Sequence, residues 1–272
     1  MTSHYAVFGN PIAHSKSPLI HAEFAKQTGQ DMDYQAILAP LDDFAGAIAA
    51  FRDQGGAGAN VTVPFKHQAF RFATRYTDRA LTAEAVNTLK FENDGTILGD
   101  NTDGAGLVRD ITENLQFSLA GKRLLLLGAG GAASGVGLSL LQCNPAELVI
   151  ANRTPAKAVL LADRLNKPGS ASGYGFNELR GSFDAVINAT SASLHGELPP
   201  LPDTLFKPGA LAYDMMYGKT DTPFMAWARQ HGASTVSDGL GMLVEQAAES
   251  FYLWRDVRPD TTPVMAMLRA GI

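Results

Sequence analysis

The stretch LLLLGAGGAA, from Leu124 to Ala133, decides the fold of this chain. The leucines indicate a strand, and the glycine-rich run follows it directly and opens a segment of helical pattern. In this context G-x-G-x-x-[GA] lets the backbone approach a pyrophosphate at a helix N-terminus. The alternative is tight packing of glycines in an ordinary βα turn. We therefore predict a Rossmann-type α/β sheet whose dinucleotide site includes Gly128, Ala129, Gly130, Gly131 and Ala132.

The end of the next predicted strand indicates which dinucleotide is bound. NAD-binding domains usually end this strand with an acidic residue that holds the ribose 2′-hydroxyl, whereas ELVIANRT ends with Asn152, Arg153 and Thr154. The guanidinium of Arg153 can pair with a 2′-phosphate through two hydrogen bonds, and Lys157 lies one helical turn further on. The alternative is a solvated arginine beside a threonine helix cap. The sequence favours NADP as the cofactor.

Short apolar runs alternate with helical patterns on both sides of this stretch. In the N-terminal part YAVFG, YQAIL and ANVTV are each followed by a helical segment, which is the order of βαβ units and of a largely parallel sheet. Asn93-Asp94-Gly95 between two strand-like runs predicts a hairpin. Two further helices are expected near the C-terminus, the second with Thr262 as its cap and Pro263 as its first residue.

The bulk composition excludes several classes of protein. The 272 residues carry a formal net charge of −5 without long charged runs, so no basic surface for nucleic acid is expected, and a small solute is the expected partner. Cys143 is the single cysteine, and the start MTSHYAVFG lacks a secretory pattern, so we expect a cytoplasmic protein. Glycines interrupt the uncharged run 124–141, which argues against a membrane span. No histidine or cysteine spacing suggests a metal site.

A second stretch, NVTVPFKH from Asn60 to His67, predicts a strand that ends at Pro64 and a helix whose first turn contains Lys66. A cation there faces the positive end of the helix dipole, which is unfavourable by a few tenths of a kcal/mol and up to about 1 kcal/mol. An amine in this place could shuttle a proton. The alternative is a solvated lysine that accepts the small cost.

Six motifs in one order resemble those of the shikimate dehydrogenase family over nearly the whole chain. They are GNPIAHSKSP (9–18), NVTVPFKH (60–67), AVNTL (85–89), GDNTDG (99–104), GAGGAA (128–133) and DGLGMLVEQA (238–247). The resemblance implies an N-terminal, mostly parallel α/β substrate domain of residues 1–102 plus 239–272, to which the C-terminal helices return. It implies a Rossmann-type NADP-binding domain of residues 103–238.

The resemblance also implies an activity and residues that carry it. The activity is the reversible NADPH-dependent reduction of 3-dehydroshikimate to shikimate, in the biosynthesis of chorismate and aromatic amino acids, by a monomer or homodimer. Lys66 would transfer the proton with Asp103 beside it. The remaining substrate-binding residues would be Ser15, Ser17, Thr62, Asn87, Tyr217 and Gln246. Met215 and Gly239 would lie near the nicotinamide, and Asp78 would be a further cofactor residue.

Each of these residues also has an ordinary structural interpretation. Ser17 precedes Pro18 as the expected cap of a helix, and Thr102 or Asp103 could cap the helix after GDNTDG. The others could be polar groups satisfied within turns, strands or helices, a core methionine, a turn glycine and a surface aspartate. Two rival functions remain open: an NAD-using quinate/shikimate dehydrogenase, and a non-catalytic sensor of shikimate-like acids.

Overall fold

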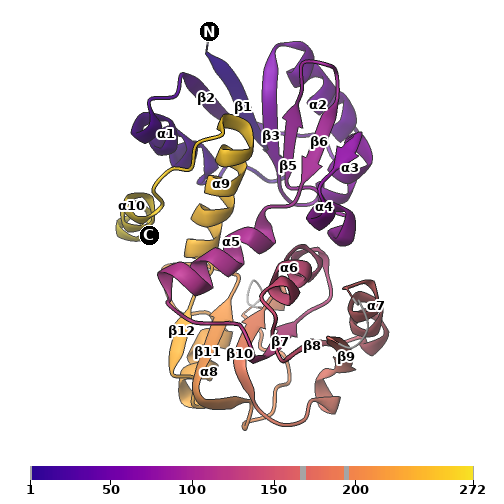
Figure 1. Ribbon diagram of the computed structural model, residues 1–272, viewed down its shortest axis with the longest axis vertical. Coiled ribbons are helices and arrows are strands. Elements are labelled where there is room, and N and C mark those ends of the chain that lie inside the picture. The colour runs from indigo at the N-terminus through magenta and orange to yellow at the C-terminus, as the bar shows by residue number, and fades with distance from the viewer. Residues whose placement is uncertain (1, 166–169, 193–195, 272) are drawn as a thin grey trace. The chain divides into compact units, whose positions relative to one another are not determined.

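Two units, each with its own sheet, make up the chain (Figure 1). The computed structural model describes residues 2–165, 170–192 and 196–271. The first unit comprises residues 1–106 and 244–270, and the second comprises 107–243 with 271–272. The boundaries fall inside α5 (Asp103–Arg109) and α9 (Leu240–Arg255), so they lie a few residues from the sequence-based limits at 102 and 239.

The sheet of the first unit has the strand order β2-β1-β3-β5-β6-β4 over the described residues. Its strands are β1 (Ser3–Gly9), β2 (Met32–Leu38), β3 (Gly56–Val61), β4 (Arg75–Tyr76), β5 (Thr88–Phe91) and β6 (Ile97–Asp100). The β1–β2, β1–β3 and β4–β6 pairs are parallel, whereas β5 runs antiparallel to β3 and to β6. The expected hairpin is confirmed, and Gly95 has the positive φ of 86° that its turn requires.

Helices cover both faces of this first sheet (Figure 1). They are α1 (Ser17–Thr28), α2 (Phe44–Asp53), α3 (Lys66–Phe72), α4 (Asp78–Ala83), α9 and α10 (Thr262–Ala270). Side chains alternate along a strand, so Phe8 of β1 packs with α2 and α3 in one apolar cluster. Tyr5 points to the opposite face, where its ring stacks on Trp254 of α9 at 4.5 Å. The C-terminal helices therefore complete the core of the N-terminal sheet, as expected.

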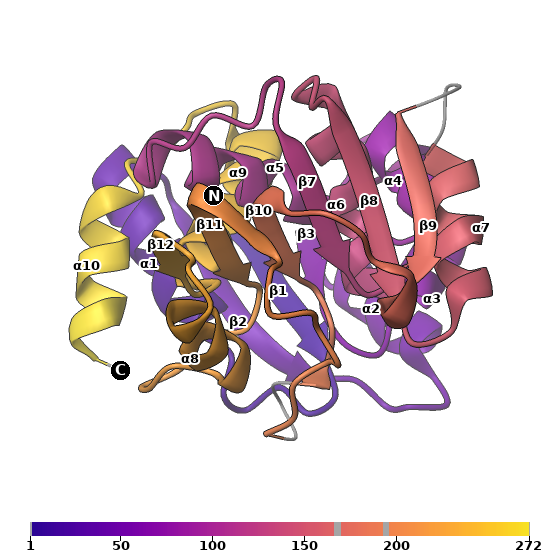
Figure 2. The same ribbon diagram turned by 90° about the horizontal axis from the view of Figure 1, so that it is seen from below.

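The second sheet is parallel throughout, in the order β12-β11-β10-β7-β8-β9 over the described residues. Figure 2 shows β10, β7, β8 and β9 side by side. The strands are β7 (Arg123–Leu127), β8 (Glu147–Asn152), β9 (Ala171–Gly175), β10 (Phe183–Asn188), β11 (Phe206–Asp214) and β12 (Thr235–Ser237). We did not predict β9 and β12, because the first is glycine-rich and the second has three residues, too short for a periodic pattern.

The four leucines of β7 divide between the two faces of this sheet. Leu124 and Leu126 belong to a cluster with α6 (Gly131–Gln142) and α7 (Pro155–Leu165), and Leu125 and Leu127 belong to one with α8 (Pro223–Gln230). All four are fully buried. The run is continuous rather than alternating because a parallel strand covered on both faces needs apolar side chains at every position. Two short helical turns, η1 (Asp110–Asn114) and η2 (Phe176–Glu178), complete the unit.

Candidate active site

Lys66 and Asp103 form an ion pair at the carboxyl ends of β3 and β6 in the first unit. The Nζ of Lys66 lies 2.5 Å from Oδ2 of Asp103, and the Lys66 side chain is partly buried while that of Asp103 is buried. The strand ends at Val61 rather than at Pro64, and Lys66 itself is the first residue of α3, after Phe65 as its cap position. Lys66 is therefore in the first helical turn, as expected, and a carboxylate faces its charge there.

Asn87 holds the other oxygen of the Asp103 carboxylate. Its Nδ2 donates to Oδ1 of Asp103 at 2.8 Å and to Oγ1 of Thr102 at 3.0 Å, and its Oδ1 accepts from the backbone N–H of Thr102 at 2.9 Å. The capping interaction seen at the start of α5 comes from Asn101, whose Oδ1 accepts from the backbone N–H of Asp103 at 3.2 Å. The Asp103 side chain is thus directed to Lys66 and Asn87.

Gln246 of α9 joins the same group of side chains. Its Oε1 lies 3.4 Å from both Nδ2 of Asn87 and Oγ1 of Thr102. Gly106 of α5 packs directly against this residue, because a Cβ at Gly106 would come within 2.6 Å of the Gln246 backbone nitrogen. The first unit therefore brings together four of the expected residues, Lys66, Asn87, Asp103 and Gln246.

Ser15, Ser17 and Thr62 lie in the segments that follow the adjacent strands β1 and β3. Our expectation that Ser17 caps α1 is wrong: Lys16 occupies the cap position in a helical backbone conformation, and Ser17 is the first helical residue. The Oγ of Ser15 instead accepts from the backbone N–H of Ser17 at 3.3 Å. Parallel strands end at the same edge of a sheet, so these residues share the edge that bears Lys66.

Two residues expected at the sites belong to the other unit in each case. Tyr217, expected to bind substrate, belongs to the second unit, where burial and then the charge of Asp238 raise its pKa. Asp78, expected to contact the cofactor, is an exposed first residue of α4 in the first unit.

A cavity of about 660 Å³ lies at the carboxyl ends of β7 and β8 in the second unit. Its lining includes every residue of the glycine-rich turn and the predicted phosphate-binding set: Gly128, Ala129, Gly130, Gly131, Ala132, Asn152, Arg153, Thr154 and Lys157. A Cβ on Gly130 or Gly131 would meet nothing within 4 Å, and α6 begins there without a side-chain cap. The N–H groups of the helix N-terminus are therefore accessible to a phosphate.

At Gly128 a glycine is required by the backbone conformation of the turn. Its φ is +105°, and a Cβ would come within 3.1 Å of the backbone oxygen of Ala189. The cavity has basic side chains where a 2′-phosphate would lie, and an NAD-type carboxylate is absent from the end of β8. The lining fits NADP.

The sequence analysis did not predict the remaining residues that line this cavity. They are Phe176, Ala189, Thr190, Ser191, Ala192, Glu197, Leu198, Pro199 and Pro200. The sequence could have predicted the residues around Thr190, because small polar residues directly follow the apolar strand β10 at the same edge of the sheet. Phe176 follows β9, a strand that was not predicted from the sequence.

Met215 and Gly239, expected near the nicotinamide, contact each other in the second unit. A Cβ on Gly239 would lie 2.2 Å from the backbone oxygen of Met215, so the two backbones touch and no larger residue fits. The backbone N–H of Met215 donates to the oxygen of Asn188 at 3.0 Å, which ties the segment to the end of β10.

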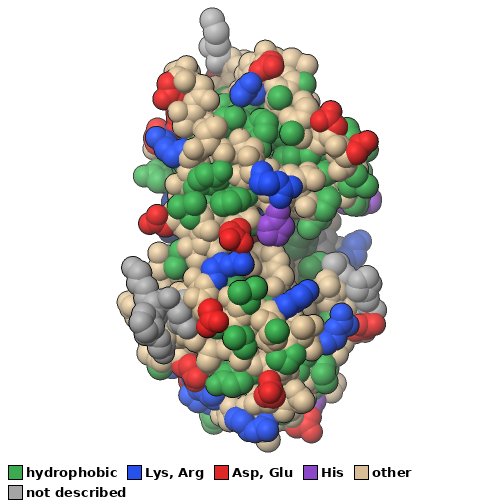
Figure 3. All heavy atoms as spheres, turned by 90° about the vertical axis from the view of Figure 1, so that its right-hand side faces the viewer, with side chains coloured by type: hydrophobic (Ala, Val, Ile, Leu, Met, Phe, Trp, Pro, Cys, Tyr) green, Lys and Arg blue, Asp and Glu red, His purple; other side chains and the backbone are tan. Residues whose placement is uncertain are grey.

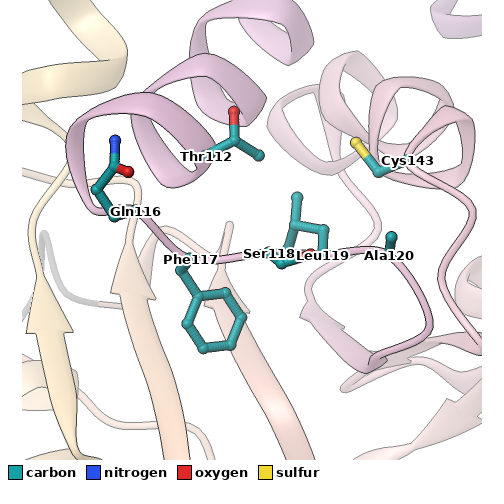
Figure 4. Close-up of a pocket in the computed structure, with 7 residues that line it drawn as sticks. All are labelled: Thr112, Gln116, Phe117, Ser118, Leu119, Ala120 and Cys143. Carbon is teal, nitrogen blue, oxygen red and sulfur yellow. The ribbon is translucent and has the colours of Figure 1, made fainter.

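A second hollow in the same unit has none of this chemistry (Figure 4). Its lining, Thr112, Gln116, Phe117, Ser118, Leu119, Ala120 and Cys143, contains no charged side chain. Burial raises the pKa of the Cys143 thiol, which donates to the backbone oxygen of Ser139 at 3.3 Å. A protonated thiol is a poor nucleophile and metal ligand, so the hollow is not a candidate active site.

Three features of the described residues bear on other functions. No group of three or more histidine, cysteine or acidic side chains is arranged to hold a metal ion among them. In the ranges that are described, no helix is both long and apolar enough to span a membrane. On the face shown in Figure 3, basic and acidic side chains are interspersed.

Comparison with known proteins covers both units. Residues 7–89 match the shikimate dehydrogenase substrate binding domain, residues 109–195 match the shikimate / quinate 5-dehydrogenase family, and residues 239–269 match the shikimate 5′-dehydrogenase C-terminal domain. The chain is 62% identical to the shikimate dehydrogenase (NADP(+)) of Dechloromonas aromatica (strain RCB), over 100% of this chain and 99% of that relative.

Solved structures agree with this relationship. The Ael1 enzyme from Pseudomonas putida is 52% identical, with a TM-score of 0.93 over 98% of each chain. Shikimate 5-dehydrogenase from Thermus thermophilus, in complex with NADP(H) and shikimate, is 30% identical, with a TM-score of 0.87 over 100% of each chain. The chain therefore belongs to the shikimate dehydrogenase family.

Proposed function

We propose that this protein catalyses the reversible reduction of 3-dehydroshikimate to shikimate with NADPH, and that Lys66 and Asp103 carry the proton transfer. The observation that supports these roles best is the 2.5 Å pair between Lys66 and Asp103, with Asn87 on the second carboxylate oxygen. The complex of the Thermus thermophilus relative with NADP(H) and shikimate supports the pair of ligands.

The chemistry requires a hydride at the carbonyl carbon and a proton at the carbonyl oxygen. When bound, the nicotinamide cofactor supplies the hydride in the reduction and accepts it in the oxidation. The ammonium of Lys66 donates a proton to the oxygen that becomes a hydroxyl, and in the reverse direction the neutral amine takes that proton back. Asp103 orients the lysine, and its carboxylate can accept a hydrogen bond from a substrate hydroxyl.

We assign the substrate carboxylate to Ser15 and Ser17. α1 is twelve residues long and its N-cap residue Lys16 makes no side-chain hydrogen bond, so the N–H groups other than that of Ser17, together with the helix dipole, favour an anion there. The substrate hydroxyls are assigned to residues that offer amide or hydroxyl groups: Thr62, Asn87, Tyr217 and Gln246.

We assign the cofactor to the cavity of the second unit. The pyrophosphate would lie at residues 128–132, and the 2′-phosphate at Asn152, Arg153, Thr154 and Lys157, where two cations line the cavity. Met215 and Gly239 would border the nicotinamide. Asp78 stays a proposed cofactor contact on the resemblance alone.

One assay separates this function from its rivals. The purified protein is mixed with shikimate and either NADP⁺ or NAD⁺, and the absorbance of the reduced nicotinamide is followed. We expect a rise in absorbance that is much faster with NADP⁺. A faster rise with NAD⁺ would favour the quinate/shikimate rival, and shikimate binding without any rise would favour the sensor. The cytoplasmic location and the state as monomer or homodimer stay predictions.

A further inference from the structure

A cluster of buried polar side chains is hydrogen-bonded to Asn87. Its members come from four different parts of the first unit and are at most 7% exposed: Asn60 of β3, Thr88 of β5, Thr102 after β6 and Ser250 of α9. The proposed reaction assigns them no role. Buried polar groups are costly unless they are paired, so the hydrogen bonds among these side chains constrain one another.

The orientation of the Asn87 carboxamide follows from its partners. A backbone N–H can only donate, and the N–H of Thr102 lies 2.9 Å from Oδ1 of Asn87, so this atom must be the amide oxygen. The two hydrogens on Nδ2 then go to Oδ1 of Asp103 and Oγ1 of Thr102. A flipped amide would place its oxygen against the Asp103 carboxylate.

The hydroxyl of Thr88 contributes to the same orientation. It donates its single hydrogen to Oδ1 of Asn87 at 2.8 Å. Its oxygen accepts from Nδ2 of Asn60 at 3.0 Å and lies 2.8 Å from Oγ of Ser250, whose hydroxyl can also donate to the backbone oxygen of Gln246 at 3.1 Å. Asn60 in turn donates to Oγ of Ser250 at 2.9 Å, and its Oδ1 accepts from the Tyr34 hydroxyl at 2.8 Å.

We propose that Thr88, supported by Ser250, is a positioning residue that orients Asp103 through the carboxamide of Asn87. The donors run from Tyr34 to Asn60, from Asn60 to Thr88 and Ser250, from Thr88 to Asn87, and from Asn87 to the carboxylate that pairs with Lys66. Ser250 connects this chain to α9, one helical turn beyond Gln246. The inference rests on the proposed function, because it concerns the geometry of the Lys66–Asp103 pair.

The test compares Thr88→Val, which replaces the hydroxyl with a methyl group of similar size, with Thr88→Ser, which keeps the hydroxyl. At saturating shikimate and NADP⁺ we expect Thr88→Val to lower kcat by about 10-fold or more and to change its pH profile, because small misplacements of catalytic groups have such effects. The KM for NADP⁺ should be unchanged. Thr88→Ser should recover kcat to within about 2-fold, and Ser250→Ala should lower kcat by less than Thr88→Val.

The matched control is Thr28→Val in α1 of the same unit. Thr28 also donates its hydroxyl to a single acceptor, the backbone oxygen of Phe24 at 2.7 Å, and its loss should leave kcat and its pH profile unchanged. Equal losses in Thr88→Val and Thr88→Ser would show that packing, not the hydroxyl, matters, and would overturn the proposal. So would a Thr88→Val variant with the kcat and pH profile of the wild type.

A second measurement does not depend on activity. The side-chain amide hydrogens of Asn87, followed by NMR, should exchange slowly with water in the wild type and in Thr88→Ser, and faster in Thr88→Val. A wild-type protein without shikimate oxidation would refute the proposed function, and the exchange of these hydrogens would still decide whether Thr88 orients Asn87. Unchanged exchange in Thr88→Val would overturn the inference in either case.

Discussion

The Nζ of Lys66 lies 2.5 Å from Oδ2 of Asp103, although the two residues are 37 positions apart in the chain. Lys66 begins α3, and Asp103 begins α5. The helix dipole at the start of α3 disfavours a cation, and the carboxylate of Asp103 offsets that effect at Nζ of Lys66, the atom that would carry the proton. The pair thus joins local helix geometry to the proposed chemistry.

Lys66→Ala is expected to lower kcat by about 10²–10⁴-fold with little change in the KM for shikimate, because a general acid–base acts mainly in the transition state. Steady-state kinetics in the direction of shikimate oxidation measure this. Lys26→Ala, which removes an exposed lysine of α1, is the control and should behave as the wild type. A near-normal kcat for Lys66→Ala at saturating shikimate would remove the lysine from the mechanism.

Ser15→Ala combined with Ser17→Ala is expected to weaken shikimate binding far more than NADP⁺ binding. The two serines lie at the start of α1 in the first unit, whereas the nucleotide cavity lies in the second. Isothermal titration with each ligand measures the two affinities, and thermal unfolding provides the stability control. An intact shikimate affinity in a variant that unfolds at lower temperature would show that the serines have a structural role alone.

Arg153→Ala is expected to lower kcat/KM for NADP⁺ by about 10- to 100-fold and to leave kcat/KM for NAD⁺ nearly unchanged. A charge-assisted hydrogen bond contributes about 1.5–3 kcal/mol, and NAD⁺ lacks the 2′-phosphate that would form it. Arg229→Ala, at an exposed arginine of α8 that pairs with Asp221, is the matched control in the same unit. Equal losses for both cofactors would mean that Arg153 supports the fold instead of recognising the phosphate.

His21 is expected to make the protein less stable in acid. Its ring is fully buried and stacks on the Tyr34 ring, with 4.2 Å between the ring centres. Burial lowers its pKa from 6.5 to about 3. Below about pH 6.5 His21 is protonated in the unfolded chain but stays neutral in the folded protein. The free energy of unfolding therefore falls by up to about 1.4 kcal/mol per pH unit toward pH 3.

His21→Phe should remove this contribution, since phenylalanine does not titrate. Urea unfolding at about pH 7 and about pH 5 should show a smaller loss of stability for His21→Phe than for the wild type. The same loss of stability in the wild type and in His21→Phe would contradict a neutral buried His21.

Tyr213→Phe is expected to destabilise the protein by about 1–3 kcal/mol, because it removes one hydrogen-bond donor from a buried carboxylate. The Tyr213 hydroxyl donates to Oδ2 of Asp110 at 2.6 Å, and both side chains are buried. Burial raises the pKa of Tyr213, so the hydroxyl stays protonated. Urea unfolding measures the loss, and Tyr252→Phe, at an exposed tyrosine, should change stability by less than about 0.5 kcal/mol.

The amino-acid sequence by itself determined the features that depend on neighbours along the chain. The leucine run followed by GAGGAA predicted β7, its turn and the start of α6, and all five turn residues line one cavity. Asn93-Asp94-Gly95 predicted the hairpin of β5 and β6. These features follow from side-chain periodicity and from the backbone freedom of glycine, which are properties of short segments.

The sequence did not predict the exact first residue of α1. Ser17 before a proline resembles a helix cap, yet the backbone of Lys16 is already helical, with φ −85° and ψ −8°, so the helix begins one residue earlier than a serine cap allows. Such differences of one or two residues at helix ends depend on how the preceding loop leaves the sheet.

Only the tertiary structure decided which polar groups meet. Thr88 and Ser250 are 162 positions apart, and no pattern in the sequence relates them, but their hydroxyl oxygens lie 2.8 Å apart. Hydrogen bonds form over about 3 Å, whereas residue periodicity shows only which face of a strand or helix a side chain occupies. The partner on that face is set by the packing of α9 on the first sheet, where Trp254 donates to the backbone oxygen of Leu89 at 3.0 Å.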